Sequence, residues 1–321
     1  MEIYMAPLRG ITDCIYRTTF LRYFKGVDRV MAPFISSLSA ANGTRRIKPA
    51  YLRDISPENN KNTELIPQIL SNDPDDFLFT AQHIFNLGWP EINWNLGCPS
   101  PMVTRKKRGS GLLPHQGQIC RVLDAVMARY PERISIKTRL GLDSAAELYR
   151  LLPILDQYPL TEIIIHPRLG CQMYKGRADL EAFQNCQPLT RHRLVYNGDI
   201  TDQDSYSRIS QHLPGVKRLM LGRGLIADPF LSTGLKAGGL CLKSDSDRDI
   251  LKSFLDDLLQ QYQGRLCGDS HILGRLKGIW RYLAVIFEDS DKVRKKITKT
   301  KKLNNYTEMV KSIFAETPFS S

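Results

Sequence analysis

The sequence lacks several signatures that would assign it to a common class of protein. Its 321 residues hold no apolar run near the ~18 uncharged residues that a membrane-spanning helix needs, and no signal-peptide pattern. Its seven cysteines are an odd number without a CxxC pair, which argues against a disulfide scaffold or zinc ribbon. It also lacks a Walker loop, a GxSxG motif, a catalytic carboxylate pair and a metal-ligating cluster. We therefore expect a cytoplasmic protein that binds no metal.

Positive charge, in contrast, is in excess. Lys and Arg total 45 against 33 Asp and Glu, a formal net charge of +12, and 42% of the residues are apolar. The apolar fraction is that of a globular protein, whereas the charge indicates a polyanionic partner. Nucleic acid is the leading candidate and an anionic membrane the second. The cations are densest in the loop 105–108 and in 292–302, where seven of eleven residues are basic and none is acidic.

Short apolar segments alternate with longer segments of helical pattern over about 235 residues. We expect eight strands, at 2–5, 28–32, 65–70, 91–95, 133–138, 162–165, 193–196 and 217–221. Strand–helix alternation implies parallel pairing, because parallel strands need crossover connections. Eight such units match a closed (β/α)8 TIM barrel. An open doubly wound sheet is the alternative, but no GxGxxG motif follows the first strand.

The alternation stops near residue 240. From residue 248 onward the pattern is helical, with helices expected at 250–262, 272–287, 292–303 and 306–314. About 75 residues suffice for a small bundle docked on the barrel. The sequence thus predicts an α/β fold, with a TIM barrel over 1–240 followed by a small all-α helical bundle over 241–321.

Polar residues and glycines follow nearly every expected strand. In a barrel these positions share the C-terminal rim, where substrates bind. Buried polar groups cost free energy unless they are partnered, so a purely structural barrel has no need of them. One large polar ligand lying across the rim accounts for all of them, which are Ala6-Pro7-Leu8, Gln68, Asn95-Leu96-Gly97-Cys98-Pro99, Lys137-Thr138-Arg139, His166-Pro167-Arg168, Asn197-Gly198-Asp199 and Gly222-Arg223-Gly224.

The last two of these loops occupy the positions at which barrels frequently bind phosphate. Their glycines let backbone N–H groups approach phosphate oxygens, and Arg223 adds charged donors, although glycines that merely end strands would look the same. We expect a phosphorylated cofactor such as flavin mononucleotide (FMN). Lys137, beside the apolar Ile136, either stabilises negative charge on the reduced flavin ring or forms an ion pair at the barrel mouth.

Cys98 lies in a Gly-Cys-Pro turn just after the fourth expected strand. Most lone cysteines pack in cores, but an exposed thiol stiffened by proline acts as a nucleophile or as a proton donor. The other six cysteines lack such a setting, and we interpret them as structural. His166 either contacts the cofactor, serves as an acid, or makes only a polar contact at its strand end.

A series of motifs therefore runs in order along the expected barrel: Met5-Ala6-Pro7, Gly10 with Thr12-Asp13, Gln68, Asn95-Leu96-Gly97-Cys98-Pro99-Ser100, Lys137-Thr138-Arg139-Leu140-Gly141, His166-Pro167-Arg168, Gln172-Met173-Tyr174, Asn197-Gly198-Asp199-Ile200 and Met220-Leu221-Gly222-Arg223-Gly224. In order, spacing and combination they resemble the tRNA-dihydrouridine synthase family, whose tRNA-binding helical bundle the C-terminal region also fits. Arg275-Leu276-Lys277 and Leu303-Asn304-Asn305 look most like the bacterial C-type branch.

The resemblance implies an FMN-dependent enzyme, driven by NADPH, that reduces the C5=C6 bond of specific uridines in the tRNA D-loop to 5,6-dihydrouridine. The hydride passes from N5 of the flavin to C6, and Cys98 donates the proton to C5. Asn95 and Arg139 match positions that face the target nucleotide, whereas Arg275 and Lys277 match bundle positions that contact tRNA. The positions that match FMN contacts are Pro7, Leu8, Gln68, Lys137, His166, Asn197, Gly198, Asp199, Gly222 and Arg223.

The chain departs from the family pattern in places that concern RNA contacts rather than the flavin site. Pro101 follows Gly-Cys-Pro-Ser where a lysine is common, and the loop 105–108 is unusually basic. Ser36 and Ser37 stand where the C-type branch suggests an arginine. Two alternative functions remain open: a flavin oxidoreductase for a free pyrimidine, similar to dihydroorotate dehydrogenases, and a non-catalytic tRNA-binding protein. We expect a monomer without an obligate protein partner.

Overall fold

Parallel strands form a barrel in the computed structural model, which describes residues 1–39, 44–239 and 244–320. In these residues the main sheet has nine strands in the order β5-β2-β1-β11-β10-β9-β8-β7-β6. Every neighbouring pair is parallel, as the strand–helix alternation predicts. The strands are β1 (Glu2–Met5), β2 (Arg29–Met31), β5 (Leu65–Ile66), β6 (Gln68–Ile69), β7 (Ile92–Leu96), β8 (Ile134–Gly141), β9 (Ile163–Leu169), β10 (Leu194–Tyr196) and β11 (Arg218–Leu221).

The two ends of this sheet are halves of one strand. Only Pro67 separates β5 from β6, and proline has no N–H group to donate to a neighbouring strand. Its carbonyl still accepts a hydrogen bond from the Asn93 backbone N–H at 2.9 Å. Since β5 pairs with β2 and β6 pairs with β7, the sheet closes through residues 65–69. The prediction of an eight-stranded barrel is therefore confirmed, and the open doubly wound sheet is excluded.

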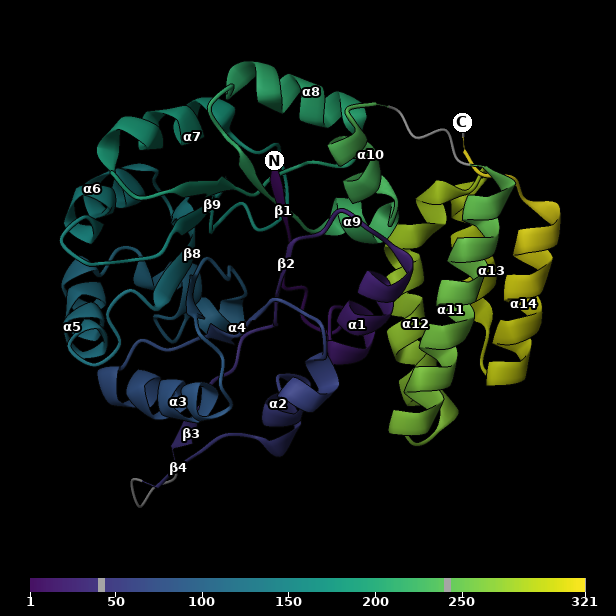
Figure 1. The fold of residues 1–321 in the computed structure, drawn as a ribbon, viewed down its shortest axis with the longest axis horizontal. Coiled ribbons are helices and arrows are strands. Elements are labelled where there is room, and N and C mark those ends of the chain that lie inside the picture. The colour runs from purple at the N-terminus through teal and green to yellow at the C-terminus, as the bar shows by residue number, and fades with distance from the viewer. Residues whose placement is uncertain (40–43, 240–243, 321) are drawn as a thin grey trace.

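Helices connect successive strands and surround the barrel (Figure 1). Several begin where the sequence offers an aspartate: the side chains of Asp13, Asp73, Asp179 and Asp202 each accept a hydrogen bond from a backbone N–H in the first helical turn. A short hairpin, β3 (Leu38–Ser39) with β4 (Arg45–Arg46), follows β2. The helices are α1 (Cys14–Tyr23), α2 (Pro49–Asp54), α3 (Pro74–Asn86), α4 (Pro101–Thr104), α5 (Gln116–Met127), α6 (Ala146–Leu155), α7 (Leu180–Cys186), α8 (Gln203–His212), α9 (Arg223–Ala227) and α10 (Leu231–Ala237).

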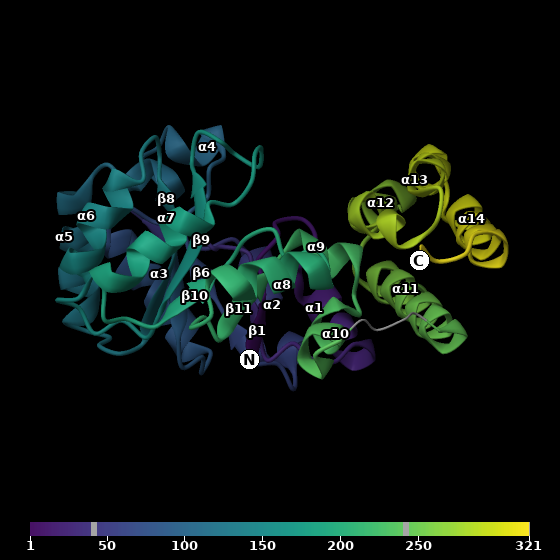
Figure 2. The same ribbon diagram turned by 90° about the horizontal axis from the view of Figure 1, so that it is seen from above.

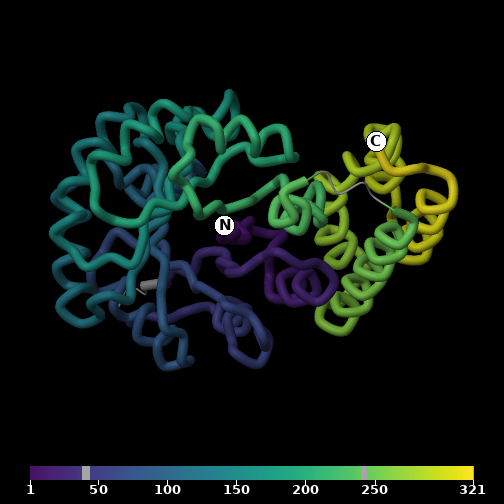
Figure 3. Tube along the Cα trace, turned by 45° about the horizontal axis from the view of Figure 1, so that its top comes forward, coloured from purple at the N-terminus to yellow at the C-terminus, as the bar shows by residue number. Residues whose placement is uncertain are grey.

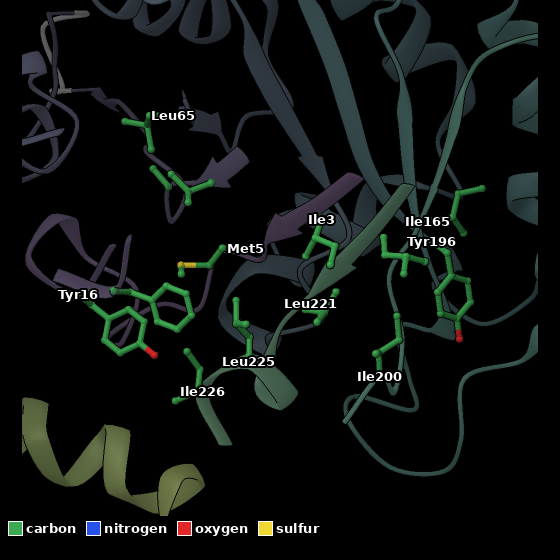
Figure 4. Close-up of a cluster of buried hydrophobic side chains, with 14 of the residues drawn as sticks. Ile3, Met5, Tyr16, Leu65, Ile165, Tyr196, Ile200, Leu221, Leu225 and Ile226 are labelled. Atoms are coloured by element: carbon green, nitrogen blue, oxygen red, sulfur yellow. The ribbon is translucent and has the colours of Figure 1, made fainter. Parts of the chain in front are cut away.

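Alternate residues of each strand face opposite sides of the barrel wall, because the side-chain period of a strand is two. In β1, Ile3 and Met5 belong to the large core that packs the wall against the helices, and Figure 4 shows them beside Leu221 and α9 residues. Tyr4 instead belongs to a separate apolar cluster with inward-facing residues of other strands, such as Met220. The same alternation decides which polar residues face the inside of the barrel.

The C-terminal region forms a helical bundle beside α1, α9 and α10 (Figures 1 and 3). Its helices are α11 (Asp245–Arg265), α12 (Asp269–Leu283), α13 (Ser290–Lys299) and α14 (Leu303–Glu316), which confirms the predicted all-α region. Phe254 of α11 packs against Phe24 and Tyr16, with ring centroids 4.9 and 5.9 Å apart. The predicted domain boundary between 240 and 241 lies outside the described residues, and the division into two domains stays a prediction.

A cluster of charged residues lies at the N-terminal end of the barrel. Tyr4 Oη donates to Glu162 Oε2 at 2.9 Å, and Arg29 Nη2 donates to Glu91 Oε2 at 2.7 Å. Arg29 Nη1 lies 3.8 Å from Glu162 Oε1, and the Glu162 side chain is only 4% exposed. Burial, and next the neighbouring charge of Glu91, raises the pKa of Glu162 to about 7.

This raised pKa predicts a pH-dependent stability. A carboxyl whose pKa is higher in the folded chain stabilises the fold fully below its ordinary pKa, here 4.5, and that stabilisation is lost as pH rises through about 7. Glu162→Gln should therefore gain free energy of unfolding relative to the unmodified protein as pH increases over that interval. Urea unfolding at pH 5 and pH 8 measures the gain, with Glu64→Gln, an exposed neighbour of Arg29, as the control. An equal difference at both pH values would contradict the argument.

Candidate active site at the barrel mouth

A cavity of about 1030 Å³ lies at the C-terminal end of the barrel strands, partly walled by α12 and the residues after it. The sequence predictions converge on it: every residue expected to contact FMN lines it, and so do the expected catalytic and nucleotide-facing residues. Arg275 and Lys277 are not among its lining residues. Those it brings together are Pro7, Leu8, Gln68, Asn95, Cys98, Lys137, Arg139, His166, Asn197, Gly198, Asp199, Gly222 and Arg223.

The convergence follows from strand register. Asn95 of β7 pairs with Lys137 of β8, and Arg139 of β8 pairs with His166 of β9, so that the three strands present polar side chains at similar heights. The predicted strand ends at 138 and 165 are wrong, because β8 continues to Gly141 and β9 to Leu169. Polar residues that face a cavity do not interrupt the backbone ladder, so Arg139 and His166 lie within strands rather than after them, and Lys137 lies within its strand as expected.

The backbone around Cys98 is held on both sides. Asn95 Oδ1 accepts hydrogen bonds from the backbone N–H groups of Gly97 and Cys98, at 3.1 and 2.9 Å. The Cys98 carbonyl accepts from the backbone N–H and the hydroxyl of Ser110, at 3.1 and 3.2 Å. Gly109 adopts a φ of +58°, and a Cβ there would lie 2.5 Å from the Cys98 carbonyl oxygen. The backbone of Cys98 is therefore held in place at the cavity wall.

The electrostatic setting of Cys98 favours its neutral form. Burial raises the pKa of the thiol, and this effect outweighs the opposing effects of the Ser100 backbone N–H and the Arg139 charge. A thiol that stays protonated at neutral pH suits a proton donor, whereas a nucleophile needs the thiolate. The raised pKa is consistent with proton donation, and the role of Cys98 stays a prediction.

A buried chain of amides connects Asn95 to the barrel interior. Asn95 Nδ2 donates to Gln68 Oε1 at 2.7 Å, and Gln68 Nε2 donates to Asn93 Oδ1 at 2.8 Å. Asn93 Nδ2 continues the chain to Ser135 Oγ at 3.0 Å. The Asn95 oxygen accepts from the Cys98 turn, and one of its two Nδ2 hydrogens is donated to Gln68. The second Nδ2 hydrogen remains for a ligand. The expectation that Asn95 faces the nucleotide stays a prediction, and the structure adds a role in holding Cys98.

Arg168 organises another part of the cavity. It is 2% exposed, and its Nη2 donates to both carboxylate oxygens of Asp199, at 2.7 and 2.6 Å, and to the Gly176 carbonyl at 2.8 Å. Its Nη1 lies 2.8 Å from His166 Nε2. A guanidinium has only donors, so Nε2 of His166 accepts and Nδ1 carries the ring proton. Burial, and then the charge of Lys137, lowers the pKa of His166 well below its ordinary value. Both observations favour a neutral imidazole whose Nδ1–H can donate a hydrogen bond, and the role of His166 stays a prediction.

The side-chain amine of Lys137 lies at the wall of the cavity. In the described part of the chain it makes no ion pair, so the alternative role in an ion pair at the mouth is not found. Burial, and next the Arg139 charge, lowers the pKa of Lys137 to about 7. Arg223 follows β11, and its Nη2 lies 3.6 Å from Asp199 Oδ1. A cavity with apolar walls, a lysine, two glycine-bearing loops and an arginine fits a planar ring with an anionic tail, and the residues present therefore fit FMN.

Several lining residues were not predicted from the sequence. Phe34 follows β2 and lies 5.1 Å from the Arg9 guanidinium, and the position after a barrel strand could have indicated it. The sequence indicates Tyr174 only as part of the motif Gln172-Met173-Tyr174. In the structure its ring centroid lies 5.4 Å from the guanidinium carbon of Arg139. Tyr282 comes from α12 in the bundle, and no sequence signal indicates that the bundle meets the barrel mouth.

The two residues predicted to contact tRNA from the bundle have internal partners. Arg275 Nη1 lies 3.9 Å from Asp13 Oδ2, where α12 meets the start of α1. Lys277 Nζ donates to the Thr298 carbonyl at 3.0 Å and also to the Thr300 carbonyl, at the C-terminal end of α13. Lys277 thus helps to hold α13 on α12. That either residue touches tRNA stays a prediction.

Membrane-spanning helices, disulfide bonds and metal sites can also be searched for among the described residues. No helix among them is both long and apolar enough to cross a bilayer. The six cysteines they include are free thiols, whereas Cys241 lies outside the described residues. In the same residues no group of three or more His, Cys, Asp and Glu side chains is arranged to hold a metal ion.

The fold is similar to that of known oxidoreductases. A structure of a morphinone reductase variant with tetrahydroNAD has a TM-score of 0.52 at 12% identity, covering 74% of this chain and 87% of that one. A histamine dehydrogenase from Rhizobium has a TM-score of 0.50 at 11% identity, covering 74% of this chain and 46% of that one. At these identities the similarity concerns the fold, and it agrees with the TIM barrel described above.

A family model described as "Dihydrouridine synthase (Dus)" matches residues 4–316, and the chain belongs to this family. The family prediction is thus confirmed. The chain is 28% identical to a tRNA-dihydrouridine(16) synthase of Pseudomonas putida, over 86% of each chain. It is 25% identical to a protein of the same name from Ralstonia nicotianae, over 87% of this chain and 85% of that one. A probable tRNA-dihydrouridine synthase of Rickettsia bellii is also 25% identical, over 82% and 78%.

Proposed function

We propose that the protein is a tRNA-dihydrouridine synthase that uses FMN and NADPH to reduce the C5=C6 bond of a uridine in the tRNA D-loop. The observation that carries the proposal is that one cavity is lined both by Cys98, whose backbone is held in place, and by Lys137, which has no ion pair among the described residues. Membership of the dihydrouridine synthase family supports the reaction type. Residues 1–240 then form the catalytic domain and 241–321 the tRNA-binding domain, acting in the cytoplasm as a monomer.

The residues that would hold FMN can be grouped by the interaction that each would make with it. The loops with Gly198 and Gly222 and the guanidinium of Arg223 would bind its phosphate. The neutral Nδ1–H of His166 and the ammonium of Lys137 would donate hydrogen bonds to it, and Gln68, positioned by its amide chain, would fix its orientation. When bound, FMN supplies the hydride that C6 of the uracil ring accepts.

Cys98 supplies the proton. Its Sγ–H is held at the cavity wall in the protonated state, which allows transfer to C5 of the ring as the double bond is lost. Arg139 lies near enough to lower the pKa of the thiol, so its charge stabilises the thiolate that the transfer leaves. Because a stacked base hides both faces of C5=C6, the uridine has to leave its stack before it enters the cavity. Asn95 and Arg139 would then contact its base.

The substrate is best assigned to tRNA rather than to a free pyrimidine. The cavity wall includes Arg281 and Tyr282 of the bundle, which a barrel acting on a small free substrate does not require. The bundle also carries the basic segment 292–302. Relatives from Pseudomonas and Ralstonia are named for position 16, and we propose uridine 16 as the target.

Mapping dihydrouridine in tRNA from cells with and without the protein tests this function. We expect loss of dihydrouridine at position 16 alone when the protein is absent. The purified protein should retain FMN and consume NADPH much faster with tRNA that lacks dihydrouridine than without tRNA. Flavin reoxidation by free uracil as efficient as by tRNA would favour the free-pyrimidine alternative. Salt-sensitive tRNA binding without NADPH consumption would favour the non-catalytic one.

A further inference from the structure

The segment that follows Cys98 folds back and makes a hydrogen bond to the Cys98 carbonyl group. We call residues 98–110 the Cys98 loop: it leaves β7, passes through α4, and ends where Ser110 hydrogen-bonds to the Cys98 carbonyl. Its outer part is anchored to the neighbouring strand–helix connection. Asn72 Nδ2 donates to the Lys106 carbonyl at 3.1 Å, and Arg108 Nε donates to Asn72 Oδ1 at 3.1 Å. The loop is therefore a preformed projection, fixed at its base and near its tip.

The tip carries positive charge that the protein does not neutralise. Arg105, Lys106 and Lys107 are exposed, and within the described residues none of them forms an ion pair. The acidic residues at the start of α3 are already engaged: Asp76 pairs with Arg45 at 2.7 Å and with Arg108 at 3.6 Å. Three adjacent unpaired cations repel each other, and phosphate groups that neutralise them remove this repulsion.

The loop also lies where a polyanion at the active site would pass. Cys98 and Pro99, at its base, line the cavity, while Tyr282 of α12 lines it from the bundle. Figure 2 shows α4 on the barrel and α12 and α13 on the bundle, all on the side of the molecule away from the N-terminus. A nucleic acid that delivers one nucleotide to the cavity therefore has cations of the barrel as well as cations of the bundle within its path.

We propose that the Cys98 loop is a second RNA-binding surface, in which Arg105, Lys106 and Lys107 hold the phosphates next to the nucleotide in the cavity. The inference rests on the proposed function, since it concerns the same RNA. No aromatic side chain accompanies the three cations on the loop, so the contact is to the phosphate backbone and reads no sequence. The surface acts separately from the bundle, and it places the backbone against the element that holds the thiol.

The test compares two triple variants that remove the same charge. Arg105→Gln, Lys106→Gln and Lys107→Gln together neutralise the loop. The control, Lys25→Gln, Arg193→Gln and Lys217→Gln, neutralises three exposed cations that precede β2, β10 and β11, at the opposite end of the barrel. Steady-state kinetics with tRNA at several salt concentrations, FMN content, and NADPH oxidation without tRNA are measured for both variants and for the unmodified protein.

We expect the loop variant to raise the KM for tRNA about tenfold or more, with kcat at saturating tRNA, FMN content and NADPH oxidation unchanged. Its salt dependence should weaken by about 0.7–0.9 in the log–log slope for each phosphate that the loop no longer neutralises. The control should match the unmodified protein. Equal effects of the two variants would overturn the inference, because only net charge would matter, and so would a lowered kcat with an unchanged KM. If the unmodified protein forms no dihydrouridine, the proposed function itself fails.

Discussion

Cys98→Ala is expected to lower the rate of dihydrouridine formation by about 10²–10⁴-fold, which is the usual contribution of a positioned general acid. The backbone contacts that hold residue 98 involve its N–H and carbonyl groups, so the substitution leaves the loop and the flavin contacts in place. The variant should therefore retain FMN and still reduce it with NADPH. Single-turnover reduction of tRNA after the flavin has been reduced measures the affected step directly.

Cys267→Ala provides the matched control for this substitution. Cys267 is an exposed free thiol between α11 and α12 and does not line the cavity. Its variant should turn over like the unmodified protein. Turnover by Cys98→Ala within a few-fold of the unmodified rate would show that the proton comes from elsewhere. Loss of FMN from that variant would show instead that Cys98 serves to pack the cavity.

Lys137→Met is expected to weaken FMN binding by about 10- to 150-fold, since a hydrogen bond to a charged group contributes about 1.5–3 kcal/mol. Methionine keeps the length of the side chain and removes the ammonium that faces the cavity. Titration of the apoprotein with FMN, followed by flavin fluorescence, measures the loss. Lys217→Met, at the opposite end of the barrel, is the control. Unchanged FMN affinity of Lys137→Met would remove Lys137 from the cofactor site.

The lowered pKa of Lys137 adds a pH dependence to this prediction. Below about 7 the side chain is already an ammonium, whereas above that value it is largely neutral and has to take up a proton before it interacts as a cation. FMN affinity should therefore fall as pH rises through about 7, with proton uptake on binding near pH 8. Calorimetry in buffers of different ionisation enthalpy measures the uptake, which Lys137→Met should abolish.

Strand periodicity explains why so much of the barrel is predictable from the sequence. All eight expected strands form, since runs such as Ile163–Ile165 are apolar on both faces, as a wall buried between helices and barrel interior requires. Local pattern does not show where a strand ends when its last residues are polar. The expected strands therefore end just before Arg139 and His166, which the structure places within β8 and β9.

The candidate site is predictable to the extent that strand ends share one rim. This rule alone brings Cys98, Lys137 and Arg223 together, although they are distant in sequence. This rule does not predict contacts between elements that are distant from one another in the sequence. Neither the pairing of Arg168 with Asp199 nor the position of Tyr282 has a local signature, because both depend on how separate elements dock.

The shared wall of the cavity has a consequence for how selectivity arises in this protein. Pro7 and Gly222 belong to the barrel, whereas Arg281 and Tyr282 belong to α12 of the bundle. Contacts such as those of Phe254 with Phe24 and Tyr16 pack the bundle against the barrel. Under the proposed function, the surroundings of the nucleotide therefore depend on both parts of the chain, although Cys98 and the proposed FMN contacts lie on the barrel alone. A small rotation of the bundle at that aromatic contact would then reshape the mouth of the cavity without moving Cys98 or Lys137.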